Sequence, residues 1–246
     1  MKTKSYVRFL NRAAHFDADI ELADVLSIAI KGGALTSRSG PHLFDYISAK
    51  RHPRLASRTS NTHNRRLAIS HLKHTLCASF LKDIYEDVMQ YMLEILEAAA
   101  RNGLDPNRLI GEHKVSLEAN EILAAGGWPS VVHIVSRSVF RKLESERSTK
   151  KLIEKINIKL QLGVEQAKID ATLPYFEIRH LIVHCDGKAD KHFCKTFPKF
   201  AAKVGQKLVL DYGVVQNARA AVIGLIDEFD RKVVLHKLVA TSELQP

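Results

Sequence analysis

The chain has 246 residues, of which 46% are hydrophobic and 26% are charged, and its formal net charge is +10 at pH 7. This hydrophobic content is ordinary for a chain that buries a core, so it excludes a chain that is disordered throughout. The basic excess favours a polyanionic partner, most often a nucleic acid, although a basic surface that is only solvated has the same charge.

Helical periodicity dominates the sequence, and the alternation typical of strands is scarce. The helices that we expect lie, in chain order, at 20–30, 64–101, 116–124, 129–144, 150–162, 165–171, 174–186 and 213–237. The segment 64–101 is either one long helix or two in near-continuity. Residues 34–62 are expected to be irregular because Gly, Pro, Ser, Thr and Asn gather there, and 205–211 to be a short strand or an extended loop.

These elements predict an all-α bundle of antiparallel helices joined by short connections. We expect residues 1–60 to be an N-terminal helical extension with a basic linker, and 61–240 to be the main helical domain. The three cysteines form no CxxC pair, which argues against a disulfide framework and fits a reducing compartment. The basic N-terminus lacks the apolar run of a signal peptide, and no stretch approaches the roughly 18 apolar residues that cross a membrane. A cytoplasmic protein without a membrane partner is therefore expected.

The helix at 174–186 carries the polar residues of most interest. At about 100° per residue, one face is apolar and consists of Tyr175, Ile178, Leu181, Ile182 and Cys185. The other side holds Glu177, Arg179, His180 and His184, with Phe176 and Val183 among them. We expect the apolar face to be buried. The polar side, because it includes two apolar residues, is expected to be a pocket wall or the seam of a dimer.

The run from Arg179 to His184 resembles the signature of the HEPN family, in which an Arg, a polar residue and then a His stand near the end of a helix. The wider segment 177–190 is similar to the bacterial branch described as RiboL-PSP-like, and the resemblance extends loosely over 60–240. It implies a HEPN-like bundle at 61–240 and a metal-independent endoribonuclease that works as a homodimer. It also implies Arg179 and His184 as the catalytic pair, repeated in two copies across a two-fold axis, with Glu177 and His180 in support.

These residue types suit the cleavage of RNA without a cofactor. A His titrates near neutrality and can remove the proton of a 2′-hydroxyl, while an Arg offers fixed charge and paired donors to phosphate oxygens. The sequence departs from the family in two places. The polar residue after the Arg is usually Asn or Asp, and here it is His180. Some members carry a Tyr two residues after the final His, as the target of a nucleotide-adding antitoxin, and here that position is Asp186.

Structural alternatives exist for the same residues. Arg179 could pair with Glu177 or another acid on a solvated face, and His184 could be a surface histidine favoured by the helix dipole. Glu177, His180 and His184 share a face on which a metal could bind, with Cys185, His192 and Cys194 nearby. Their spacing matches no known zinc motif, so we expect no metal.

Basic residues gather in two further segments. No acid occurs from Tyr46 to Lys82, and in this stretch we expect RNA-binding residues at Arg58, Arg65, Arg66 and Lys73. The second segment, 137–159, is diluted by glutamates. The function that we expect is a toxin or antiviral defence effector that cuts tRNA or mRNA by attack of the 2′-hydroxyl, with an antitoxin protein as a further partner. The alternatives are a non-catalytic HEPN-like module that binds RNA or protein, and a helical adaptor without a nucleic-acid role.

Overall fold

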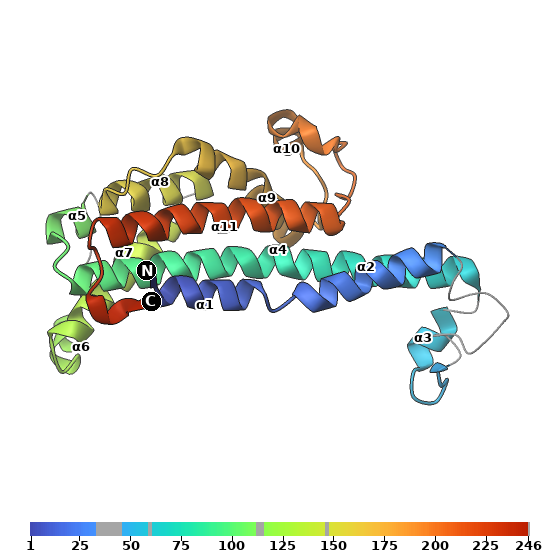
Figure 1. The fold of residues 1–246 in the computed structure, drawn as a ribbon, viewed down its shortest axis with the longest axis horizontal. Helices are drawn as coiled ribbons and strands as arrows, with labels where there is room; N and C mark the ends of the chain where they lie inside the picture. Colours follow the sequence, from blue (N-terminus) through green and yellow to red (C-terminus); the bar gives the residue numbers. More distant parts are fainter. Residues whose placement is uncertain (33–45, 59–60, 112–115, 146–147, 246) are drawn as a thin grey trace.

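A single helix of 40 residues, α4 (Thr62–Arg101), runs along the length of the molecule, and the other long helices pack around it (Figure 1). The structure is a computed structural model and describes residues 1–32, 46–58, 61–111, 116–145 and 148–245. The other helices within these ranges are α1 (Lys4–Ala13), α2 (Asp17–Lys31), α3 (Pro53–Arg58), α5 (Pro106–Ile110), α6 (Ala119–Ala124), α7 (Trp128–Glu144), α8 (Thr149–Leu160), α9 (Gln166–His184), α10 (Lys191–Thr196), and α11 (Tyr212–Leu235), with 3-10 turns η2 (Pro198–Phe200) and η3 (Thr241–Glu243). The expected all-α fold is confirmed.

The helices form layers on different sides of α4. Helices α1 and α2 follow each other along one side, α11 lies along another, and α7, α8 and α9 cover the rest. One cluster of buried side chains joins these layers, and α1 and α2 contribute Phe9 and Ile20 to it. The expected boundary near residue 60 thus lies at the start of α4, and the helices before that boundary share the core. No helix in the described ranges is long and apolar enough to cross a membrane.

Several expected helix ends agree with the structure because local signals set them. The stretch 64–101 is one helix, free of Pro and Gly throughout. Ser148 caps α8 by accepting a hydrogen bond from the Lys151 N–H. The loop at 205–211 is extended and forms an isolated bridge between Lys207 and Lys188. Of the segment 34–62, which was expected to be irregular, residues 34–45 and 59–60 lie outside the described ranges, and 53–58 form the short helix α3, contrary to the expectation.

The structure also corrects the expected helices, since the short helices α5 and α10 were not expected and two longer helices differ from the prediction. Helix α1 was not expected, although Tyr6, Phe9 and Ala13 recur at helical spacing and are buried. The expected pair of helices at 165–171 and 174–186 is one helix, α9, with Pro174 inside it. Proline removes one backbone donor and normally ends a helix. Here Pro174 is buried by tertiary packing, and the carbonyl it leaves free belongs to the exposed residue Asp170, where water can bind it.

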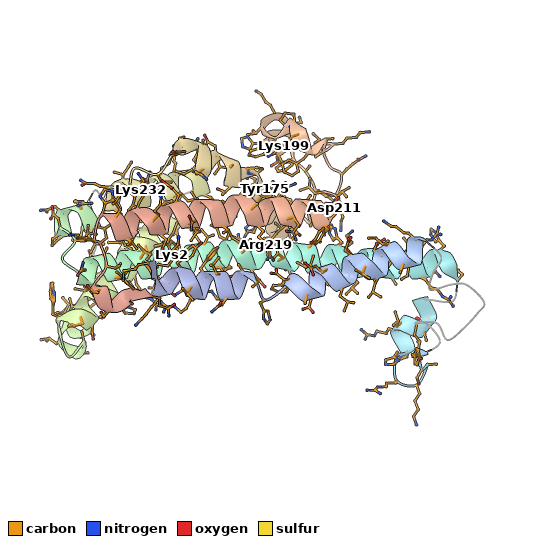
Figure 2. All side chains as sticks on the ribbon, viewed as in Figure 1. Lys2, Tyr175, Lys199, Asp211, Arg219 and Lys232 are labelled. Atoms are coloured by element: carbon orange, nitrogen blue, oxygen red, sulfur yellow. The ribbon has the colours of Figure 1, made fainter. Side chains whose placement is uncertain are left out.

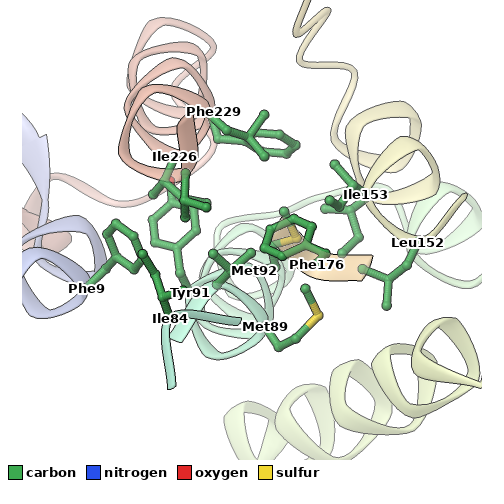
Figure 3. Packing of buried hydrophobic residues seen from close by; sticks show 14 of the residues in the cluster. Phe9, Ile84, Met89, Tyr91, Met92, Leu152, Ile153, Phe176, Ile226 and Phe229 are labelled. Carbon is green, nitrogen blue, oxygen red and sulfur yellow. The ribbon is translucent and has the colours of Figure 1, made fainter. Parts of the chain in front are cut away.

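A further correction concerns Phe176, which we expected on the polar side of its helix. Phe176 is only 3% exposed and belongs to the core. Figure 3 shows its ring close to Met92 of α4 and Ile153 of α8. It also meets the ring of Tyr85 edge to face, with centroids 5.4 Å apart. Phe176 is therefore not available for a dimer seam.

The two chain ends pair as short strands, and a buried carboxylate fastens the first of these strands to the bundle. Strand β1 (Lys2–Thr3) pairs antiparallel with β2 (Leu244–Gln245) beside α11. Asp230 of α11 is fully buried and accepts hydrogen bonds from the Thr3 backbone N–H at 3.2 Å, the Thr3 hydroxyl at 2.5 Å and the Tyr91 hydroxyl at 3.3 Å. One side chain thus fastens the N-terminal strand to α4 and α11.

Replacing Asp230 by alanine should lower the free energy of unfolding by about 1–3 kcal/mol, because buried donors of Thr3 and Tyr91 lose their acceptor. Asp230→Asn should cost less, since the amide oxygen can still accept one of these bonds. Urea denaturation of both variants measures the difference. If Asp230→Ala were as stable as the unmodified protein, the hydrogen bonds of Asp230 with Thr3 and Tyr91 would not stabilise the fold.

Candidate functional site

Helix α9 packs against three other helices, and its C-terminal half presents only a narrow stripe to solvent. It packs against α11, α4 and α8. Tyr175, Ile178 and Leu181 are buried, as their helical spacing predicts. The exposed residues near its C-terminal end are His180, Val183 and His184, and Val183 is 45% exposed. The residues of the expected catalytic motif therefore divide between a solvent-facing stripe and the contact with α4.

The two histidines of the stripe form a pair. His180 and His184 stand one helical turn apart, with ring centroids separated by 4.7 Å and ring planes inclined at 47°. Both side chains are exposed. Two imidazoles this close can serve one substrate, one removing a proton and the other donating one. The pair exists because position 180 is a histidine, where the motif that this segment resembles usually has Asn or Asp.

Arg179 points away from this pair toward α4. Its Nη2 lies 2.5 Å from the Oε1 of Glu86, and its guanidinium carbon lies 4.4 Å from the centre of the Tyr85 ring. The Arg179 side chain is 22% exposed, whereas that of Glu86 is 62% exposed. Arg179 therefore forms an ion pair, as the structural alternative in the sequence analysis allowed, but its partner is Glu86 of α4 and not Glu177.

The geometry of α9 keeps Arg179 and His184 apart within one chain. Five residues of helix correspond to a rotation of about 140° and a rise of about 7.5 Å. Among the described residues no hydrogen bond or ion pair joins Arg179 to His184. Glu177 is half-buried, and no hydrogen bond or ion pair links it to another described residue. The histidine pair is therefore the part of the expected site that the fold brings together.

A cleft between α4 and α7 lies next to Arg179. Its volume is about 230 Å³, and it is lined by Glu86, Met89, Gln90, Leu93, Arg137, Phe140, Arg141 and Glu144. Burial, with the nearby charge of Glu86, raises the pKa of Glu144. Burial also raises the pKa of Tyr85, while its hydrogen bond with Thr149 and the charge of Arg179 act in the opposite direction. Because the two arginines of the cleft are matched by two glutamates, the cleft does not form a strongly basic pocket for a phosphate.

The structure also bears on the residues that were weighed as metal ligands in the sequence, where no metal was expected. Glu177, His180 and His184 share one side of α9, but no group of three or more His, Cys, Asp or Glu side chains in the described ranges could hold a metal ion. Cys185 and Cys194 are free thiols and partly buried. The chemistry that this stripe can offer is acid–base chemistry by the two imidazoles.

The expected RNA-binding residues lie near the N-terminal end of α4. Arg66 is exposed, whereas Lys73 pairs with Asp24 of α2 at 2.5 Å and so helps to fasten α2 to α4. Arg65 is partly buried, and the side chain of Arg58 lies outside the described residues. Arg66 and Glu86 are 20 residues apart on one straight helix, which corresponds to about 30 Å. This surface is therefore well separated from Arg179.

A basic group that the sequence analysis missed follows the histidine pair along the chain. Six exposed lysines follow one another at spacings of three or four residues, and they are Lys188, Lys191, Lys195, Lys199, Lys203 and Lys207. Only one acid, Asp190, occurs between the first and the last of them. The same criterion that selected 46–82, a stretch rich in basic residues and poor in acids, would have identified this segment.

Comparison of the chain with protein-family models, with curated proteins and with solved structures gives no significant match. The resemblance to HEPN proteins therefore depends on the residues of the motif itself.

Proposed function

We propose that this protein binds RNA and cuts it without a metal ion, with His184 as the general base. The observation that carries the proposal is the exposed pair of His180 and His184 near the end of α9, the helix that also carries Arg179. The net charge of +10 supports a polyanionic substrate. The resemblance of the motif to that of HEPN ribonucleases supports RNA as that substrate.

The reaction follows from the two imidazoles. Neutral His184 removes the proton of a 2′-hydroxyl, and the 2′-oxygen attacks the adjacent phosphorus. The bond from phosphorus to the 5′-oxygen breaks, and protonated His180 gives its proton to the departing oxygen. The products carry a 2′,3′-cyclic phosphate and a 5′-hydroxyl. Arg179 stabilises the charge on the phosphate oxygens once its guanidinium exchanges Glu86 for the substrate.

A second copy of the chain completes the site in this proposal. Arg179 and His184 point in directions about 140° apart, so one phosphate reaches both most readily if two α9 helices face each other. With Phe176 buried, the apolar contribution of α9 to such a seam comes from Val183. The cellular role that we propose is a cytoplasmic toxin or antiviral defence effector acting on tRNA or mRNA, held in check by an antitoxin protein.

The proposal is tested by incubating the purified full-length protein with tRNA and with an mRNA in the presence of EDTA. Cleavage should persist, because no metal has to activate water. The upstream fragments should end in a cyclic phosphate and the downstream fragments should begin with a 5′-hydroxyl. Loss of cleavage in EDTA, or a 5′-phosphate on the downstream fragment, would contradict the mechanism.

The second candidate function is RNA binding without cleavage. The observation in its favour is that Arg179 is already paired with Glu86 and stacked on Tyr85, as a purely structural arginine would be. Tight, salt-dependent RNA binding by a protein that leaves RNA intact would establish this alternative.

A further inference from the structure

The six lysines described above lie on one projecting lobe. This lysine lobe (residues 188–207) comprises α10, η2 and the loop that follows, and it stands away from the bundle between α9 and α11 (Figure 1). Figure 2 labels Lys199 on this lobe. The lobe begins four residues after His184 along the chain, and its Phe200 packs on Tyr175 of the apolar face of α9.

The lobe is rigidly attached to the bundle. Phe193 is buried, and its ring packs against the rings of Phe197 and Phe200, with centroids 5.3 and 5.6 Å away. Phe200 in turn meets the ring of Tyr175 on α9 edge to face. Backbone hydrogen bonds close the base of the lobe, from Gly205 N to Ala189 O at 2.8 Å and from Ala189 N to Gln206 O at 2.9 Å. A surface held in this way needs little ordering when it binds.

Most of the positive charge on the lobe is not neutralised by nearby acids. Asp186 is shared by Lys188 and Lys207 at 3.8 and 3.3 Å. Asp190 accepts the Phe193 N–H and caps α10. Among the described residues, no carboxylate pairs with the other four lysines, which are Lys191, Lys195, Lys199 and Lys203. Lys199 lies over the rings of Tyr175 and Phe200, at 5.8 and 5.3 Å from their centres.

The lobe also adds its charge to that of α4. Burial, and after it the positive charges of Lys207 and His71, lower the pKa of the partly buried His74. Lys207 is therefore close enough to α4 to act on that histidine. This end of the lobe thus lies within electrostatic range of His74, although 133 residues separate the two along the chain.

We propose that the lysine lobe is the surface that holds the sugar-phosphate backbone of single-stranded RNA, a proposal that rests on the proposed function. Lysines of this kind bind phosphates as point charges and place no demand on base sequence. The half-buried rings of Phe197 and Phe200 among the lysines are the combination of cation and aromatic surface that suits a single strand. Binding of this kind needs neither a double-stranded RNA nor a particular base sequence.

The test measures binding separately from cleavage. All variants carry His184→Ala, so that the RNA stays intact, and the ligand is a fluorescent 20-nucleotide oligouridine. The lobe variant carries Lys191→Gln, Lys195→Gln and Lys203→Gln. The matched control carries Lys4→Gln, Lys142→Gln and Lys168→Gln, three exposed lysines elsewhere that give the same change in net charge. Fluorescence anisotropy at several salt concentrations gives the affinity and its salt dependence.

Each lost phosphate contact should reduce the slope of log K against log salt by about 0.7, so the lobe variant should lose about 2 units of slope. Its affinity near 0.1 M salt should fall by about ten- to a hundredfold, while the control keeps most of its affinity. Equal slopes for the lobe variant and the control would overturn the proposal. So would lobe-dependent binding to vesicles with 30% anionic lipid when the RNA affinity is unchanged.

These outcomes are distinct from the failure of the proposed function. If the protein with His184 intact does not cut RNA while the lobe variant loses binding, the lobe is an RNA surface of a non-catalytic protein. If the protein cuts RNA but the lobe variant binds as the control does, the catalytic proposal stands and the lobe proposal is wrong.

Discussion

His184→Ala should lower the rate of RNA cleavage by about 10²–10⁴, because the reaction loses its general base. The substitution should leave the fold intact, since His184 is exposed and surface changes usually alter stability by less than about 0.5 kcal/mol. The loss should appear in kcat with little change in KM, because the proton is transferred only in the transition state. The measurement is a single-turnover time course with an oligonucleotide substrate in EDTA.

A matched control is His236→Ala, another exposed histidine, which follows the C-terminal end of α11. Its cleavage rate should equal that of the unmodified protein. Arg179→Ala should also reduce cleavage, by about 10²–10³, because a donor to the developing charge is lost. Wild-type cleavage by the His184→Ala protein would show that the active site has been assigned to the wrong residue.

Phe176→Ala should lower the free energy of unfolding by about 3–5 kcal/mol, the usual cost of removing a buried aromatic ring. Phe176 lies between α4 and α8 and meets Tyr85 edge to face, so its removal leaves a cavity where three helices join. Val183→Ala, on the same helix but largely exposed, should change stability by less than about 1 kcal/mol. Urea denaturation followed by circular dichroism compares the two variants.

If Phe176→Ala does not fold, Phe176→Leu keeps the comparison possible, because a leucine fills part of the same space and should cost less. Similar stability losses for positions 176 and 183 would contradict the burial seen in the structure. The substitutions at positions 176 and 183 also distinguish an effect on folding from an effect on dimer formation. Val183→Ala should weaken the proposed dimer without unfolding the chain, which light scattering can detect.

Local sequence signals were sufficient for α4, α7 and α11. In α4 an uninterrupted run without Pro or Gly carries apolar residues at helical spacing, and each residue adds one hydrogen bond to a helix already begun. The Ser148 cap and the Pro near the start of α7 likewise act within one turn. Helices α5 and α10 have only five and six residues, so too few positions repeat for a periodic pattern to be read.

Pro174 shows where a local rule gave way to tertiary packing. Its missing N–H predicts a helix start, and in isolation α9 would be expected to break there. The structure instead continues the helix, since Pro174 and its neighbours Tyr175 and Phe176 are buried against the bundle. The stability gained from burying these side chains exceeds the cost of one lost hydrogen bond.

The sequence by itself determined the all-α class, the extent of α4, and the position of Arg179, His180 and His184 on one helix. The tertiary structure alone decided which of these side chains face water. A helical wheel assumes one buried face, but α9 is covered by α4, α8 and α11, so Phe176 and much of Arg179 are enclosed as well. The partner of Arg179 is Glu86, 93 residues away, and such a pairing depends on how two helices pack rather than on any spacing within either of them.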